Sequence, residues 1–281
     1  MVKVITVNNF KGGVSKTSTT IGMAYILSEK MDYKTLVIDI DPQADATETL
    51  LLTYGIKTEE DHSDVENYNI TINGEEKKSL YGTFKDNLNV NECLINLNSN
   101  LDIIPSNFNM IGFPHLLEDL GYNRTNGATV LDKLIQPIKD DYDYILIDTP
   151  PTISDYSNNA IYACDYSLIV MQTHRRSYRA VASFVDYLSL FKDINQIEFE
   201  IAGILPVMFK KAGKVDKSVL KDAKEKYGEY LFETYVHQRD RVKLWDETGI
   251  TDNDYHDKKT LEMYNLITEY LLKEIDSYES E

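Results

Sequence analysis

The chain has little cysteine, no long apolar run and too few basic residues to balance its acidic ones. Its two cysteines, Cys93 and Cys164, form no C-x-x-C pair, which argues against a disulfide framework or a zinc site and favours two reduced core thiols. No apolar stretch reaches 18 residues, and a predicted strand begins within a few residues of the N-terminus. We therefore expect neither a membrane span nor a signal peptide, and a soluble cytoplasmic protein.

The shortage of basic residues is not uniform along the chain. Lys and Arg number 29 against 46 Asp and Glu, for a formal net charge of −17, which by itself argues against a polyanionic partner. Residues 174–243, however, hold 14 basic against 10 acidic residues, whereas the rest of the chain holds 15 against 36. The basic charge is concentrated in one region.

Apolar runs alternate with helical patterns along the 281 residues, of which 42% are hydrophobic. A helix predicted over 18–30 lies between the first two runs and forms a βαβ unit with them. Such apolar strands, spaced by helices, predict a doubly wound α/β fold with a mostly parallel sheet covered by helices on both faces. The predicted strands are 2–7, 35–40, 101–105, 142–148, 166–171 and 201–207.

Residues 57–78, KTEEDHSDVENYNITINGEEKK, depart from this rhythm because they are acidic, rich in Asn and poor in large aliphatic side chains. We expect a surface insertion there, in a single domain that spans 1–281. The acidic tail after Asp276 is expected to fray.

The stretch FKGGVSKTST, residues 10–19, follows the first predicted strand and precedes a predicted helix. In that position backbone N–H groups and a helix N-terminus can bind phosphate, Lys16 can reach the β- and γ-phosphates, and Thr17 can bind Mg²⁺. Gly12 and Gly13 permit close backbone approach. Ser15 stands where the usual G-x-x-x-x-G-K-[ST] pattern has glycine, so an ordinary turn before a capped helix is the alternative for this stretch taken alone.

Aspartates end two of the predicted strands, Asp39 and Asp41 in VIDIDPQAD and Asp148 in YILIDTPP. The carboxyl ends of parallel strands are where an open α/β sheet binds its ligand, so we expect these carboxylates to converge on Mg²⁺ and an attacking water. Each could separately cap a turn.

The pattern K-G-G-V-x-K-T-[ST], followed by D-x-D-P-Q and ILID-x-PP, resembles the deviant Walker ATPases of the ParA/MinD superfamily. LDIIPSN (101–107), SNNAI (157–161) and GILPVMFKK … YLFETYVHQRDRVKLWDE resemble the ParA partition branch, so the resemblance covers nearly the whole chain except 57–78. It implies a P-loop NTPase fold that uses ATP and Mg²⁺.

The resemblance also implies a homodimer in ATP, in which two protomers sandwich two nucleotides and the signature lysine, Lys11, reaches the partner's phosphates. Asp41 would orient the hydrolytic water beside the switch residue Asp39, giving slow hydrolysis without a partner. Ser15 departs even from the deviant pattern, which normally has glycine at this position. A side chain there can alter the geometry of the γ-phosphate, and with it the hydrolysis rate. The implied catalytic residues are Lys11, Lys16 and Asp41. The implied metal-site residues are Thr17, Asp39 and Asp148. The implied nucleotide contacts are Lys11, Gly12, Gly13, Val14, Ser15, Lys16, Thr17, Ser18, Pro206, Val207, Met208 and Phe209.

The ParA branch further implies non-specific DNA binding, nucleoid association and a ParB-like centromere-binding partner. Four lysines between 214 and 224 follow helical spacing and share one face, opposite Val215, Val219, Ala223 and Tyr227. An ordinary solvated basic face is the alternative. The candidate DNA contacts are Lys210, Lys211, Lys214, Lys217, Lys221, Lys224, Arg239, Arg241 and Lys243. HRRSYR (174–179) could instead meet the nucleotide or the dimer partner.

Three other functions compete with partition. A MinD-like membrane-cycling ATPase needs a basic amphipathic C-terminal helix, whereas LLKEIDSYESE is acidic and no membrane partner is expected. A relative of the nitrogenase iron protein needs cluster-ligating cysteines, which Cys93 and Cys164 do not resemble. The third alternative is an ATP-gated DNA-binding regulator or repressor with incidental hydrolysis. Turnover with and without DNA and a centromere-binding protein separates it from a partition ATPase.

Overall fold

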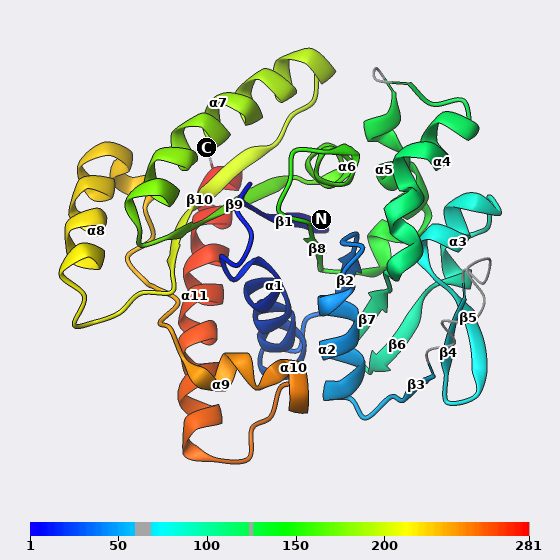
Figure 1. Ribbon diagram of the computed structural model, residues 1–281, viewed down its shortest axis with the longest axis horizontal. Helices are drawn as coiled ribbons and strands as arrows, with labels where there is room; N and C mark the ends of the chain where they lie inside the picture. Colours follow the sequence, from blue (N-terminus) through cyan, green and yellow to red (C-terminus); the bar gives the residue numbers. More distant parts are fainter. Residues whose placement is uncertain (60–68, 124–125, 281) are drawn as a thin grey trace.

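The computed structural model describes residues 1–59, 69–123 and 126–280, and a seven-stranded sheet crosses its centre (Figure 1). The strands run in the order β10-β9-β1-β8-β2-β7-β6. Their bounds are β1 Lys3–Asn8, β2 Thr35–Asp39, β6 Ile95–Asn98, β7 Leu101–Ile104, β8 Tyr144–Asp148, β9 Tyr166–Gln172 and β10 Glu200–Val207.

Every pairing in this sheet is parallel except that of β6 with β7. The predicted mostly parallel sheet is therefore confirmed, with each predicted strand found within two residues of its expected bounds. The edge strand β6 was not predicted, because its INLN sequence is short and half polar. At the centre, β1 lies between β9 and β8, and β8 pairs in turn with β2.

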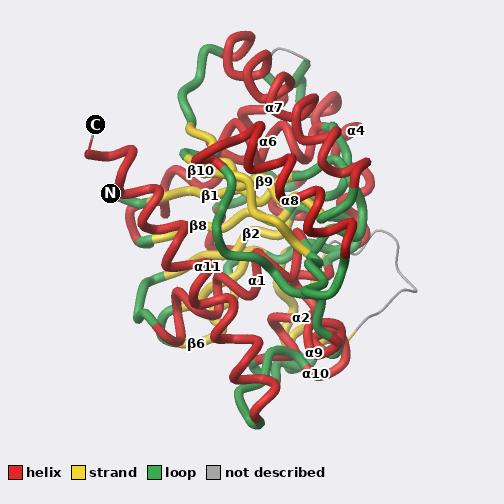
Figure 2. The backbone as a smooth tube through the Cα atoms, turned by 90° about the vertical axis from the view of Figure 1, so that its left-hand side faces the viewer, coloured by secondary structure: helices red, strands yellow, loops and turns green. Residues whose placement is uncertain are grey.

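Helices cover both faces of the sheet (Figure 2). Alternate strand residues separate them into two cores: Val4 packs with α4 to α7, and Ile5 packs with α1, α2, α10 and α11. The helices are α1 Lys16–Tyr25, α2 Asp45–Thr53, α3 Leu80–Lys85, α4 Phe113–Asp119, α5 Val130–Ile135, α6 Asp155–Ala163, α7 Arg175–Asn195, α8 Lys214–Tyr227, α9 Asp240–Lys243, α10 Trp245–Thr248 and α11 Tyr255–Ser280. The expected helix over 18–30 begins at Lys16 and continues past Tyr25 as a π-helix, Ile26–Lys30.

The described residues of the segment expected as a surface insertion, 57–59 and 69–78, contribute no strand to the main sheet. They form a second, antiparallel sheet from β3 Thr58–Glu59, β4 Asn69–Ile72 and β5 Glu75–Lys78, and residues 60–68 of the segment lie outside the described part of the chain. Charged residues make up all of β5, whereas Ile72 of β4 packs against the core that contains Ile5.

The acidic C-terminus differs from the expectation of a frayed tail. Helix α11 continues to Ser280, Lys3 forms ion pairs with Asp276 at 3.1 Å and Glu279 at 3.0 Å, and the Tyr278 hydroxyl donates to the Ile201 carbonyl at 3.1 Å. Acidic composition did not reveal that these side chains meet β1 and β10. Among the described residues, no helix combines the length and apolarity needed to span a membrane.

Gly203 in β10 provides a stability prediction. Its φ of +141° is a conformation that favours glycine, and a Cβ there would lie 2.4 Å from the Phe232 ring. Gly203→Ala is expected to lower the free energy of unfolding by ~3 kcal/mol, because backbone strain adds to overpacking. Urea denaturation measures it. Gly121→Ala is the matched control, since Gly121 also has positive φ (+81°) but a Cβ there would have no non-adjacent described residue within 4 Å. Equal losses in both variants would contradict the predicted clash.

Candidate nucleotide-binding site

The predicted phosphate loop connects the end of β1 to the N-terminus of α1, as its sequence position required. Gly13 has φ +67°, and Ser15, the residue just before the helix, has φ 59° and is also left-handed. A side chain is disfavoured in that conformation, which explains physically why glycine is usual where this chain has Ser15. The loop adopts its turn despite the serine.

Lys16 lies at the first residue of α1 and is only 6% exposed. Burial lowers the pKa of its ammonium group, while the nearby carboxylates of Asp148 and Asp41 oppose that shift. The two carboxylates do not fully offset the cost of burying the Lys16 charge, so an anionic ligand that approaches the ammonium group would be bound favourably. Lys16 is therefore placed as a phosphate-binding lysine needs to be.

Asp148, fully buried at the end of β8, joins the loop to the sheet. Its carboxylate accepts hydrogen bonds from the hydroxyls of Thr17 at 2.8 Å and Thr20 at 3.1 Å. Burial raises the pKa of Asp148, and hydrogen bonding to Thr17 opposes the rise. Thr20 was not predicted; its place one turn after Lys16 is the signal that could have found it.

Asp39 is the register partner of Asp148 across β2 and β8. One carboxylate oxygen accepts from the Asp41 amide at 3.1 Å, and the other accepts from the Thr47 amide at 2.9 Å and the Thr47 hydroxyl at 2.7 Å. Burial, and then the charge of Asp148, raise the pKa of Asp39 well above its usual range. Both oxygens of Asp39 therefore accept hydrogen bonds within the protein, as do both oxygens of Asp148. The metal role of Asp39 stays a prediction.

Asp41 is held by its backbone as well as its side chain. Its carboxylate accepts from the Gln43 amide at 2.9 Å, and its carbonyl accepts from the Ser106 hydroxyl at 2.6 Å. The Ser106 amide in turn donates to the Thr47 hydroxyl at 3.0 Å, which closes a network around Asp39. Thr47 and Ser106 had no predicted role, although Ser106 belongs to the LDIIPSN stretch.

The donor set here fits Mg²⁺, because the Thr17 hydroxyl and the Asp148 carboxylate are hard oxygen groups at one end of the loop. No group of three or more His, Cys, Asp or Glu that could hold a metal occurs in the part of the chain that the structure describes. A magnesium ion at this edge would therefore take further oxygen ligands from phosphates and water.

A cavity of about 420 Å³ opens beside these residues. Its lining includes residues 12–18 of the loop together with Asp41 and Gln43, and also four residues of α9 and α10 that were not predicted for this site: Val242, Lys243, Trp245 and Asp246. A larger, mostly apolar cavity of about 660 Å³ between α7, β10 and α8 contains none of the predicted site residues. The smaller cavity is the candidate nucleotide site.

Two parts of the predicted nucleotide contacts do not line this cavity. Lys11 precedes it, with its amide donating to the Asn9 side chain at 2.8 Å. Residues 206–209 lie at the end of β10, where the Pro206 carbonyl accepts from the Val236 amide at 2.9 Å. Their assignment to nucleotide stays a prediction.

The predicted basic face lies on α8, at the edge of the molecule (Figure 1). Its four lysines, Lys214, Lys217, Lys221 and Lys224, are exposed, and Val219 and Ala223 are buried as expected. Val215 is 56% exposed, which differs from the predicted apolar side because the first turn of α8 extends beyond the core.

Two of the other basic candidates lie on α9. Arg241, on α9, forms ion pairs with Asp254 and Asp257, and Lys243 lines the candidate nucleotide cavity. Arg175 of the HRRSYR cluster forms an ion pair with Asp222 on α8, so the start of α7 contacts α8.

Comparisons with known proteins agree with this geometry. The family model described as an AAA domain (AAA_31) matches residues 2–201. The chromosome partitioning protein ParA of Myxococcus xanthus is 27% identical over 241 residues, covering 85% of this chain and 77% of that protein.

Two solved structures share the fold. A Borrelia burgdorferi protein described as a plasmid partition protein and bound to AMPPNP has a TM-score of 0.73 and 22% identity, covering 99% of this chain and 100% of that one. The cobyrinic acid a,c-diamide synthase of Mycobacterium smegmatis, with an ATP analogue and magnesium, has a TM-score of 0.76 and 19% identity, covering 97% and 95%. The loop before α1 and the aspartates at the strand ends are features of P-loop ATPases, and the family model matches the same part of the chain. The chain belongs to the AAA_31 family of P-loop ATPases within the ParA/MinD superfamily.

Proposed function

We propose that this protein is a DNA partition ATPase that dimerises around ATP, binds DNA non-specifically as the dimer, and is reset by hydrolysis that a ParB-like centromere-binding protein stimulates. The observation that carries the proposal is a cavity at the loop lined by Lys16, Thr17 and Asp41, with the buried Asp148 hydrogen-bonded to Thr17, in a chain similar to a chromosome partitioning protein. DNA binding measured with ATP, ADP and no nucleotide, at two salt concentrations, tests it.

In this proposal the loop amides and Lys16 bind the phosphates of ATP, and Thr17 and Asp148 hold Mg²⁺, Asp148 acting through water. The metal would neutralise charge on the phosphates. Asp41 orients the attacking water, with its backbone held by Ser106. An aspartate that only positions water supports slow turnover, so hydrolysis serves as a timer until a partner improves the geometry.

Lys11 completes the site of the second protomer. Its backbone is fixed by Asn9, whose side-chain amide donates to the Val170 carbonyl, while the Lys11 side chain is partly exposed. A lysine anchored at the start of the loop but outside the cavity lining of its own protomer suits a contact made across a dimer. ATP would then be required for dimerisation.

The exposed lysines of α8, together with Lys210 and Lys211, would form the DNA surface. Among the described residues, no ion pair engages Lys214 or Lys217, so both charges are available to phosphate. Pairing two such surfaces in a dimer roughly doubles the phosphate contacts in one binding event. We leave Arg241 and Lys243 out of this proposed surface, because Arg241 forms ion pairs with Asp254 and Asp257 and Lys243 lines the candidate nucleotide cavity. Arg239 stays a predicted DNA contact.

Two variants should separate dimerisation from DNA binding. Lys11→Ala is expected to retain ATP in the monomer but lose ATP-dependent DNA binding. Lys217→Glu with Lys221→Glu is expected to dimerise normally and lose DNA affinity, with a flatter salt dependence, because each neutralised phosphate contributes ~0.9 to the log–log slope. Sizing chromatography and DNA titration at two salt concentrations measure both effects.

Lys258→Glu with Lys273→Glu provides the matched control, since it changes the charge equally at exposed positions on α11. It should bind DNA nearly as the wild type does. If Lys11→Ala bound DNA as tightly as the wild type in ATP, the sandwich dimer would be wrong. An unchanged slope in the α8 variant would place the DNA surface elsewhere. If neither DNA nor a centromere-binding protein stimulated turnover, an ATP-gated regulator would be the better description.

A further inference from the structure

In the segment formed by α9 and α10, α10 lies against α2 (Figure 1). Four residues of this segment line the candidate nucleotide cavity and form one wall of it. Of the segment's exposed polar residues, Lys243 and Asp246 line the cavity, whereas Trp245 is 2% exposed and packs on Tyr264 with ring centroids 5.3 Å apart. Lys16 and Lys243 are the two cations among the described residues that line this cavity. A nucleotide bound there would lie in a cavity that both lysines line.

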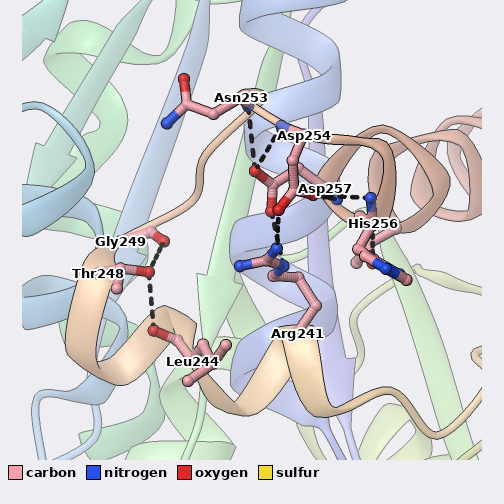
Figure 3. A network of polar contacts seen from close by, with 9 residues as sticks. Arg241, Leu244, Thr248, Gly249, Asn253, Asp254, His256 and Asp257 are labelled. Carbon is pink, nitrogen blue, oxygen red and sulfur yellow. Dashed lines mark hydrogen bonds and ion pairs between the residues drawn. The ribbon is translucent and has the colours of Figure 1, made fainter.

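One end of this segment is fixed to α11 by Arg241 (Figure 3). Its guanidinium pairs with Asp254, and its Nε lies 2.9 Å from a carboxylate oxygen of Asp257, whose side chain is 2% exposed. The same two aspartates cap α11 reciprocally: the Asp257 amide donates to Asp254 at 3.0 Å, and the Asp254 amide donates to Asp257 at 3.2 Å. Arg241 thus compensates two carboxylates that the start of α11 brings together.

The other end is fixed to α2. The Ile250 amide donates to the Thr53 hydroxyl at 2.8 Å, and a Cβ on Gly249 would lie 2.6 Å from the Thr53 backbone. The segment is therefore held at both ends. Among the described residues, Lys243 forms one ion pair, an exposed i,i+3 contact with Asp240 at 3.2 Å. Such exposed pairs contribute little stability, so an anionic ligand can compete for this lysine.

We propose that Lys243 is a second cation of the nucleotide site, contacting the anionic part of a bound nucleotide, and that Arg241 is a positioning residue that holds the α9–α10 wall in place for it. The inference rests on the proposed ATP binding and names a further contact for it. It assigns Arg241 and Lys243 to nucleotide rather than to DNA.

The experiment is calorimetric titration of the full chain with ATP and ADP in the absence of DNA, paired with the emission of Trp245, the only tryptophan of the chain. Lys243→Ala is expected to weaken nucleotide binding about tenfold, as loss of a charge-assisted contact does, with the full nucleotide-induced change in Trp245 emission at saturation. Lys258→Ala, an exposed lysine on α11, is the matched control and should bind as the wild type does.

Arg241 is tested by a graded pair of variants. Arg241→Lys keeps the charge but cannot bridge two carboxylates as a guanidinium does, so its affinity should fall between those of the wild type and Arg241→Met. If Arg241→Met does not fold, Lys243→Ala still tests the proposal, because Lys243 is exposed and its replacement should not disturb folding. Wild-type affinity in Lys243→Ala, or binding with no change in Trp245 emission, would overturn this inference while leaving ATP binding intact. A wild-type protein that binds no nucleotide would overturn the inference and the proposed function together.

Discussion

Lys16→Ala is expected to abolish ATP binding, weakening it by at least about a hundredfold, because the ammonium group that faces the phosphates is lost. The backbone amides of the loop cannot replace the lost Lys16 charge, because they supply only partial charges to the phosphates. Dimerisation and DNA binding in ATP should be lost with it. Calorimetric titration with ATP measures the effect.

The same variant should remain folded. Burial lowers the pKa of Lys16, so the nucleotide-free folded state disfavours its charge, and replacing it with alanine should not lower the free energy of unfolding. Urea denaturation of the nucleotide-free protein checks this. Wild-type ATP affinity in Lys16→Ala would refute the assignment of the loop, whereas loss of both folding and binding would refute the account of Lys16 as a strained buried cation.

Asp41→Ala is expected to retain ATP binding but reduce hydrolysis at least a hundredfold, so that ATP-bound dimers accumulate. The phosphate cradle does not include the Asp41 carboxylate, and the Asp41 backbone stays anchored by the Ser106 hydroxyl. What is lost is the group that positions the attacking water. Phosphate release and sizing chromatography in ATP report the two effects.

Ser106→Ala is the companion variant, because it removes the hydrogen bond to the Asp41 carbonyl and leaves the carboxylate present. Its hydrolysis rate should fall between those of the wild type and Asp41→Ala, with ATP affinity unchanged. An Asp41→Ala protein that stays monomeric at saturating ATP would contradict the assigned role. So would one that hydrolyses ATP at the wild-type rate.

The sequence by itself determined the sheet and the phosphate end of the site. Short apolar runs spaced by helices required a mostly parallel sheet, and a loop between strand and helix required Lys16 at a helix N-terminus. Asp39 and Asp148 end their strands side by side because parallel strands bring their carboxyl ends to one edge. These inferences succeeded because each depends on residues close together in the chain and on one rule of strand geometry.

The tertiary structure alone decided which distant segments complete the site. Ser106 reaches Asp41 across 65 residues, and Ile250 reaches Thr53 across 197. No local period or motif specifies such contacts, since they depend on how the loops between elements pack. Arg241 illustrates the difference: its sequence shows only that it lies in a basic stretch, whereas the tertiary structure pairs its guanidinium with the buried Asp257 of α11.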